Sequence, residues 1–142
     1  SQLRCITSLN YSSAYLCVKK LLDYIHRNKT AAMIRGALLA GAELGNPSDA
    51  VRAAFSEYGE KLGIAFQVAD DILDACSTSE SMGKTVGKDA QEGKLTYVSL
   101  YGVEESKKRL AELTEAAKHA IEPVDADGFF RDLAQQMLIR TH

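Results

Sequence analysis

The sequence predicts an all-α protein, and three observations support that fold class. Apolar residues recur at intervals of three and four along most of the 142 residues, while alternation with a period of two is scarce. The only two prolines, Pro47 and Pro123, both lie between helix-like segments. The composition, 46% apolar and 25% charged, is that of an ordinary globular chain. We therefore expect one helical domain, or part of a larger one.

Six segments have the apolar spacing of a helix, and helix-stopping residues separate several of them. Gly45 and Pro47 lie between the second and third, because glycine ends helices and proline suits a first turn. Pro123 separates the last two. The residues R-N-K-T at 27–30 either separate the first two segments or kink one longer helix. The expected helices are residues 13–27, 30–44, 48–75, 94–101, 103–121 and 127–139.

The apolar faces of these segments predict the core. The third segment contains Gly59 and Gly63. Glycine inside a helix costs about 1 kcal/mol relative to alanine, so we expect close packing or a bend there. Residues 77–93 lack a period, and we expect an irregular loop. The side chains expected to face inward are Leu16, Lys20, Leu21, Leu22 and Ile25, then Leu110, Leu113, Ala117 and Ile121, and finally Phe129, Phe130, Leu133, Met137 and Leu138.

Composition and charge argue against several classes of protein. Lys plus Arg is 17 and Asp plus Glu is 19, so the net charge of -2 disfavours general nucleic-acid binding, which needs a basic face. Cys5, Cys17 and Cys76 lie far apart without metal-binding spacing, which favours a reducing compartment such as the cytoplasm. The most apolar stretch, residues 30–44, is too short and too charged for a membrane span, and we see no secretory signal.

The run F-Q-V-A-D-D-I-L-D at residues 66–74 carries most of the functional information. On a helix, Asp70 and Asp74 are one turn apart, Asp71 lies beside them, and Gln67 is one turn earlier. Three close carboxylates repel one another unless a cation binds there. Such hard oxygen ligands suit Mg²⁺, which commonly takes one or two carboxylates together with phosphates and waters. On this run alone, a solvated acidic face explains the pattern about equally well.

Two basic segments favour a site for magnesium and a phosphate group. Lys84 and Lys94 alternate with glycines after the acidic run, so the lysines can bind phosphate oxygens while the backbone approaches closely. Lys29 and Thr30 lie at a helix break, where an ammonium, a hydroxyl and helix N–H groups can bind an anion. Alone, each segment is better explained as ordinary polar surface. A P-loop is excluded, because its first glycine would fall on Thr78.

Together, these segments resemble the trans-isoprenyl diphosphate synthases, the family of farnesyl and geranylgeranyl diphosphate synthases. Residues 66–74 match the family's second aspartate-rich motif, F-Q-x-x-D-D-x-x-D, at every fixed position. The glycine-lysine loop at 83–96 and the earlier Lys-Thr pair follow the family's order and spacing. The resemblance implies an isoprenoid-synthase helical bundle, of which residues 22–142 form the C-terminal half of a polyprenyl synthetase domain. Residues 1–21 are expected to be a divergent N-terminal segment.

The resemblance also implies a reaction: magnesium-dependent, head-to-tail condensation of an allylic diphosphate with isopentenyl diphosphate, which releases pyrophosphate. Mg²⁺ and lysines would neutralise the leaving pyrophosphate, and apolar walls would shield the carbocation from water. The implied metal ligands are Asp70, Asp71 and Asp74, with Asp70 the most direct. The implied diphosphate-binding residues are Lys29, Thr30, Gln67, Lys84 and Lys94, and the implied catalytic residues are Lys29, Gln67 and Asp70.

The first part of the sequence departs from the family pattern. No D-D-x-x-D precedes Leu22, and residues 1–10 lack the Gly-Gln element that the family places before its Lys-Thr helix. We therefore expect the isolated chain to be inactive, and to form a homodimer or pair with a partner chain that supplies the other half. The alternative is a non-catalytic or regulatory helical subunit that pairs with an intact synthase. A plain helical interaction protein ranks last, because it leaves the three matching segments unexplained.

Overall fold

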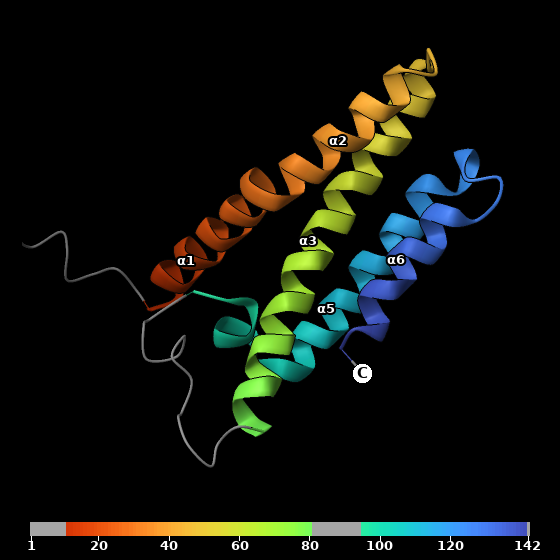
Figure 1. The fold of residues 1–142 in the computed structure, drawn as a ribbon. Coiled ribbons are helices and arrows are strands. Elements are labelled where there is room, and N and C mark those ends of the chain that lie inside the picture. Colours follow the sequence, from red (N-terminus) through yellow and green to blue (C-terminus); the bar gives the residue numbers. More distant parts are fainter. Residues whose placement is uncertain (1–10, 81–94, 142) are drawn as a thin grey trace, which may run out of the picture.

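A computed structural model describes residues 11–80 and 95–141, which are helical and contain no strand. This confirms the expected all-α class. In Figure 1, α1 and α2 form one line, of which α2 runs beside α3 while α1 diverges from it; α5 and α6 lie on the other side of α3. The elements are α1 (Tyr11–His26), the turn η2 (Arg27–Ala31), α2 (Ala32–Glu43), α3 (Asp49–Glu80), α5 (Tyr97–Ile121), the 3₁₀ turn η3 (Glu122–Val124) and α6 (Phe129–Ile139).

The first two expected helices form one longer helix with an irregular turn. The π-helical turn η2 joins α1 directly to α2, at the R-N-K-T residues that the sequence marks as a possible break. A single π turn of this kind inserts extra backbone into a helix without ending it. The alternative of a kinked longer helix is therefore the correct one, and the turn carries Lys29 and Thr30.

The helix α3 is longer than the sequence suggests. It continues to Glu80, so the expected irregular loop does not begin at residue 77. Ser77 explains the difference, because its Oγ donates to the carbonyl oxygen of Leu73 at 2.7 Å, inside the helix. A serine hydroxyl inside a helix can donate to a backbone carbonyl of the preceding turn. A serine-rich stretch is therefore a weak sign of a helix end. The remainder of the expected loop, residues 81–93, lies outside the described residues.

Two glycines bring α3 close to the α1–α2 line. A Cβ atom at Gly63 would lie 2.3 Å from Ala31 Cα, and one at Gly59 would lie 2.7 Å from Arg35 Cα. Neither distance is possible for a real Cβ, so only glycine permits this approach. Of the two explanations for these glycines, close packing is therefore correct. The contact fixes η2 against the middle of α3.

The core lies mainly between α3 and α5. All four apolar residues that the sequence places on the inner face of the long C-terminal helix are buried, as predicted. Gly102, at φ 80° and ψ 169°, interrupts α5 where the sequence separates residues 94–101 from 103–121. The buried apolar residues of the two helices are Tyr58, Leu62, Ile64, Ala65, Val68, Ala69, Ile72, Tyr97, Leu110, Leu113, Ala117 and Ile121.

Contacts around η3 hold α6 in place. Asp125 accepts hydrogen bonds from the backbone N–H groups of Phe130 and Arg131, and from the Arg131 guanidinium. Burial acts to raise the pKa of Asp125, but these hydrogen bonds outweigh it and keep the pKa below its usual range. The Tyr58 hydroxyl donates to the Phe130 carbonyl at 2.8 Å, and the Phe130 ring packs edge-on against Phe55 and Tyr58. These contacts determine where the beginning of α6 lies.

The predicted inner face of α6 is only partly correct. Met137 is buried, and Phe130 and Leu138 pack against the core. Phe129 and Leu133 are exposed, which contradicts the prediction. The reason is that α6 lies at the edge of the described bundle, where it has neighbours on one side only (Figure 1).

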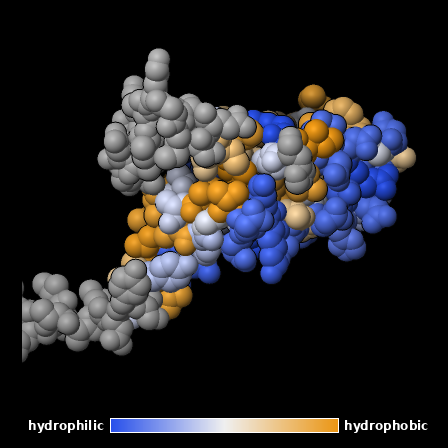
Figure 2. Space-filling view, turned by 90° about the horizontal axis from the view of Figure 1, so that it is seen from below, coloured by the Kyte–Doolittle hydropathy of each residue, from blue (hydrophilic) through white to orange (hydrophobic). Residues whose placement is uncertain are grey.

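The predicted inner face of α1 is largely wrong. Leu22 is buried, but Leu16, Lys20, Leu21 and Ile25 are exposed. Among the described residues, α1 packs against the rest of the chain mainly near its C-terminal end, so the apolar side chains along its length lack a covering neighbour. Figure 2 shows apolar side chains, in orange, at the surface in the half of the molecule that contains α1. None of the described helices combines the length and apolar character needed to cross a membrane.

Candidate functional site

The acidic run lies on the C-terminal half of α3 and is polar on one side only. Val68, Ala69 and Ile72 are completely buried, which anchors this part of α3 in the core. Asp70 is half-exposed and Asp74 is exposed. The buried and acidic residues alternate with the period of a helix, so the carboxylates emerge from a rigid, well-packed segment. This confirms that a narrow acidic seam runs along a mostly apolar helix.

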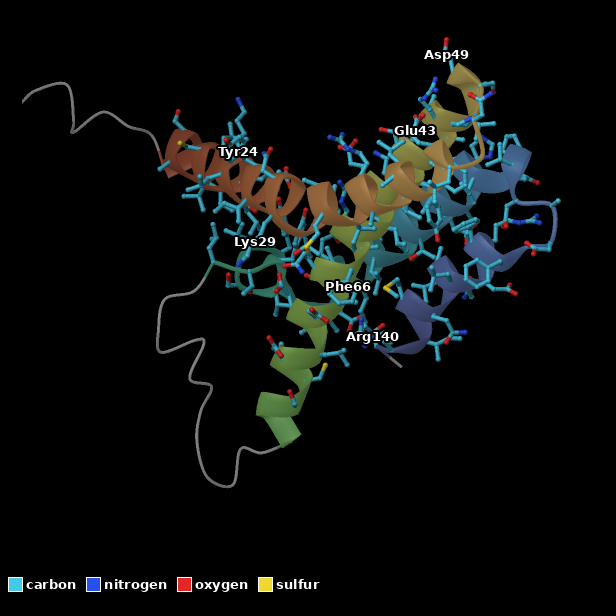
Figure 3. All side chains as sticks on the ribbon, turned by 45° about the horizontal axis from the view of Figure 1, so that its top comes forward. Tyr24, Lys29, Glu43, Asp49, Phe66 and Arg140 are labelled. Carbon is cyan, nitrogen blue, oxygen red and sulfur yellow. The ribbon has the colours of Figure 1, made fainter. Side chains whose placement is uncertain are left out.

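Arg140 binds Asp70. The helix α6 ends beside this part of α3, and Arg140 Nη2 donates to Asp70 Oδ1 at 3.1 Å. The guanidinium also lies over the Phe66 ring, with 5.0 Å between Cζ and the ring centroid. Figure 3 shows Phe66 and Arg140 next to each other at the end of α6. The sequence interpretation missed this contact, because the two partners are 70 residues apart and no local pattern links them.

Asp71 holds the beginning of α5. Its Oδ2 accepts a hydrogen bond from the Tyr97 backbone N–H at 2.9 Å. Thr96 caps the same helix end, because its hydroxyl accepts from the Ser99 N–H while the Ser99 hydroxyl accepts from the Thr96 N–H. An acid at a helix N-terminus satisfies a backbone donor that has no partner within the helix. Asp71 therefore has a structural partner in addition to its expected metal role.

Tyr97 connects α5 to α1 as well. Its side chain is buried, and its hydroxyl donates to Asp23 Oδ1 at 2.8 Å. Burial, and secondly the bond to Asp23, raise the pKa of Tyr97 well above its usual range. Beside it lies a cavity of about 300 Å³ between α1 and α5, where Lys19 lies over the Tyr101 ring. The sequence interpretation missed Tyr97, although its position directly after the glycine-lysine loop was a usable signal.

The other predicted site residues come from α3, from η2 and from the part of the chain outside the described residues. Gln67 is half-buried on α3, one turn before Asp70. Lys29 is exposed and Thr30 half-buried on η2. In Figure 3, Lys29 lies to the left of α3 and Arg140 to its right. Within the described part of the chain, no hydrogen bond or ion pair joins Lys29 to the carboxylates of Asp70, Asp71 or Asp74. Lys84 and Lys94 lie outside the described residues.

The carboxylates fit an open magnesium site rather than a complete metal cage. In residues 11–80 and 95–141, no three Asp, Glu, His or Cys side chains are arranged to enclose a metal ion. Mg²⁺ does not need such a cage, because it commonly binds one or two carboxylates and completes its shell with phosphate oxygens and waters. Asp70 and Asp74 provide hard oxygens one helical turn apart. A cation, the Arg140 guanidinium, already binds Asp70. The donor set therefore fits Mg²⁺.

Comparison with known proteins identifies the family. The family model described as polyprenyl synthetase matches residues 9–127, which is most of the chain. The chain belongs to the polyprenyl synthetase family. This confirms the resemblance drawn from the acidic run, the glycine-lysine loop and the Lys-Thr pair. It also accounts for the partial all-α bundle, since the matched residues include α1 to α5.

Individual relatives of this chain are considerably longer. A dimethylallyltranstransferase from Fischerella ambigua is 38% identical over 122 residues, which are 85% of this chain and 35% of the relative. A geranylgeranyl diphosphate synthase from Cyanophora paradoxa is 44% identical over 100 residues, or 70% of this chain and 33% of the relative. A protein named heterodimeric geranylgeranyl pyrophosphate synthase large subunit 2, from Arabidopsis thaliana, is 42% identical over 101 residues. These residues are 71% of this chain and 27% of the relative. The chain thus spans about a third of these relatives' length.

Proposed function

We propose that this chain forms one side of the active site of a magnesium-dependent trans-prenyltransferase. The reaction joins an allylic diphosphate, such as dimethylallyl, geranyl or farnesyl diphosphate, to isopentenyl diphosphate in isoprenoid biosynthesis. The observation that carries this proposal is the acidic seam of α3, where Asp70 and Asp74 extend from a helix whose opposite side is packed in the core. The names of the relatives, a dimethylallyltranstransferase and a geranylgeranyl diphosphate synthase, support the reaction class.

The proposed metal ligands are Asp70, Asp71 and Asp74, with Asp70 the most direct. Bound Mg²⁺ would supply positive charge to the pyrophosphate as it leaves. The rigid packing of Val68 and Ile72 behind the carboxylates holds them in place before the ligand arrives, which limits the ordering cost of binding.

The proposed diphosphate-binding residues come from three segments. On η2, the Lys29 ammonium and the Thr30 hydroxyl bind diphosphate oxygens, and on α3 Gln67 orients the reacting end of the allylic substrate. Lys84 and Lys94 complete the positive side of the site by their place in the family motif. Lys29, Gln67 and Asp70 are the proposed catalytic residues, since each would contact the allylic diphosphate or its metal.

The second carboxylate cluster of the family's site is proposed to come from other residues. Within the 142 residues, D-D-x-x-D occurs once, at positions 70–74. We propose that residues 22–142 are the C-terminal half of the synthase domain and that residues 1–21 form a divergent segment. The remaining half belongs to a longer polypeptide or to a partner chain, in a homodimer or a heterodimer, and the isolated 142 residues are inactive. The exposed apolar side chains of α1 support this proposal, because they provide a surface for such a partner.

A regulatory, non-catalytic subunit is the second candidate function. It is favoured by the contacts of the acidic run, since Arg140 binds Asp70 and the Tyr97 N–H binds Asp71 in the described chain. The name of one relative, the large subunit of a heterodimeric synthase, supports this candidate. For the location we propose a reducing compartment, such as the cytoplasm, because the cysteines of the sequence lie far apart without the spacing of a disulfide framework.

The proposed function is tested by calorimetric titration of the 142-residue chain with farnesyl diphosphate, with and without Mg²⁺. We expect binding that requires Mg²⁺ and disappears in the double variant Asp70→Asn/Asp74→Asn, because the amides keep the shape but lose the charge. Glu57→Gln is the matched control, since it removes one exposed acid from the same helix, several turns away. Equal binding by the double variant and the control would contradict the proposal. With isopentenyl diphosphate added as the second substrate, binding without turnover would support the half-site, whereas turnover by the isolated chain would refute its expected inactivity.

A further inference from the structure

Arg140 lies where a divalent cation would approach Asp70. The hydrogen bonds of Asp125 and Tyr58 hold the beginning of α6, and Arg140 follows directly at the C-terminal end of that helix. Its guanidinium donates to Asp70 Oδ1 at 3.1 Å. The two side chains are 37% and 39% exposed, so a dissolved ion can reach the pair.

We propose that Arg140 competes with Mg²⁺ for the carboxylate of Asp70. This inference rests on the proposed function, because it takes Asp70 as a metal ligand. A guanidinium and a divalent ion on one carboxylate would lie a few ångströms apart and repel each other. Mg²⁺ therefore binds Asp70 only as Arg140 leaves it, and each cation lowers the apparent affinity of the other.

The Phe66 ring gives the displaced guanidinium a second place to bind. Arg140 Cζ already lies 5.0 Å from the centroid of that ring, within the range of a cation–π contact. The side chain can therefore release Asp70 by a change of rotamer while it keeps its contact with Phe66. Such an exchange requires no movement of α6, whose start is fixed at Asp125.

The expected size of the effect follows from the exposure of the pair. Ion pairs that are partly exposed to water change an equilibrium by roughly two- to five-fold. Removing the guanidinium should therefore tighten Mg²⁺ binding by that factor. A neutral side chain at this position would leave the metal with no cation to displace.

The experiment is a titration of the 142-residue chain with MgCl₂ alone, followed by the NMR signals of the Asp70 backbone amide and the Arg140 side-chain Nε–Hε group. We expect the Arg140 signal to shift together with the Asp70 signal as Mg²⁺ is added. In Arg140→Gln, Mg²⁺ should bind roughly two- to five-fold more tightly. Arg140→Lys keeps the charge and should remain close to the original affinity. Lys61→Gln removes a cation elsewhere on α3 and controls for the general change in net charge.

Each outcome decides the proposal. Unchanged or weaker Mg²⁺ binding in Arg140→Gln overturns it, as does an equal gain in Lys61→Gln. Tighter Mg²⁺ binding in Arg140→Gln, combined with no binding of farnesyl diphosphate, would uphold the competition and refute the proposed function. Diphosphate binding that depends on Asp70, combined with no effect of Arg140→Gln on Mg²⁺, would uphold the proposed function and refute the competition. Absence of Mg²⁺ binding in every variant would overturn both.

Discussion

At the scale of single residues, Tyr97 connects three helices, of which α3 carries the acidic seam and α1 continues into the turn η2 with Lys29 and Thr30. It begins α5, its backbone N–H binds Asp71 on α3, and its hydroxyl binds Asp23 on α1. Asp23 lies six residues before Lys29 on the same continuous helix. The hydroxyl contact therefore fixes that helix relative to the acidic seam. Tyr97 touches no ligand in the proposed site and acts by positioning other groups.

Tyr97→Phe tests this role. The variant keeps the ring and the backbone N–H but removes the hydroxyl, which leaves the Asp23 carboxylate without this donor. We expect the free energy of unfolding to fall by about 1–2 kcal/mol, because hydrogen bonds to charged groups are worth somewhat more than neutral ones. Tyr101→Phe is the matched control, since Tyr101 stacks on Tyr97 and its ring is retained. Urea denaturation measures both, and an equal loss in the two variants would contradict the prediction.

At the scale of elements, the position of η2 depends on the absence of a side chain at Gly63. A methyl group there would lie 2.3 Å from Ala31 Cα, which is backbone and cannot rotate away. The helices would have to separate. Because η2 carries Lys29 and Thr30, this separation would also move the basic part of the proposed site away from α3.

Gly63→Ala should therefore destabilise the chain by about 1–3 kcal/mol, the usual cost of overpacking. Alanine is the better helix former by about 1 kcal/mol, so a variant without a steric conflict would gain stability instead. Gly36→Ala on α2 is the control, because no described atom outside its immediate helix backbone lies within 4 Å of its added methyl group. Thermal unfolding should show opposite shifts for the two variants. A higher melting temperature for Gly63→Ala would refute the close contact.

The helices could largely be predicted from the sequence, because periodic apolar spacing and helix-stopping residues are local signals. The end of α3 could not, since Ser77 bonds to Leu73 inside the helix, whereas serines usually suggest a loop. The exposed face of α1 could not either, because the burial of a helix face depends on which neighbours are present. The candidate site also has a part that local sequence predicts and a part that it does not. The carboxylates follow from a local motif, but the contact between Arg140 and Asp70 joins residues 70 positions apart.

At the scale of the whole molecule, α1 exposes apolar side chains that no other described helix covers. Large apolar side chains along α1 are exposed, whereas many of those on α3 and α5 are buried. Figure 2 shows orange surface in the half of the molecule that contains α1. A contiguous apolar surface of this kind usually marks an interface. The exposed apolar side chains of α1 are Tyr15, Leu16, Val18, Leu21, Tyr24 and Ile25.

The isolated chain should therefore associate with itself as its concentration rises. In Leu21→Gln/Ile25→Gln, two apolar contacts one helical turn apart are lost, so we expect association to weaken by about tenfold or more. The melting temperature should change little, because both side chains are exposed within the described chain. Sedimentation velocity at several concentrations measures the change. Ile139→Gln, an exposed apolar residue on α6, is the control. A chain that stays monomeric at every concentration would contradict the prediction.

The packing of α2 has a consequence for local opening. This helix contains no buried residue, although its backbone passes close to α3 where Arg35 lies against Gly59. Two glycines, Gly36 and Gly41, also weaken it as a helix. Segments with few buried contacts open at a lower free energy than the core, so the amides of α2 should exchange with solvent faster than those of α3. The basic part of the proposed site adjoins α2, whereas the acidic part stands on α3, where Val68, Ala69 and Ile72 are completely buried. We therefore expect ligand binding to order mainly the basic side.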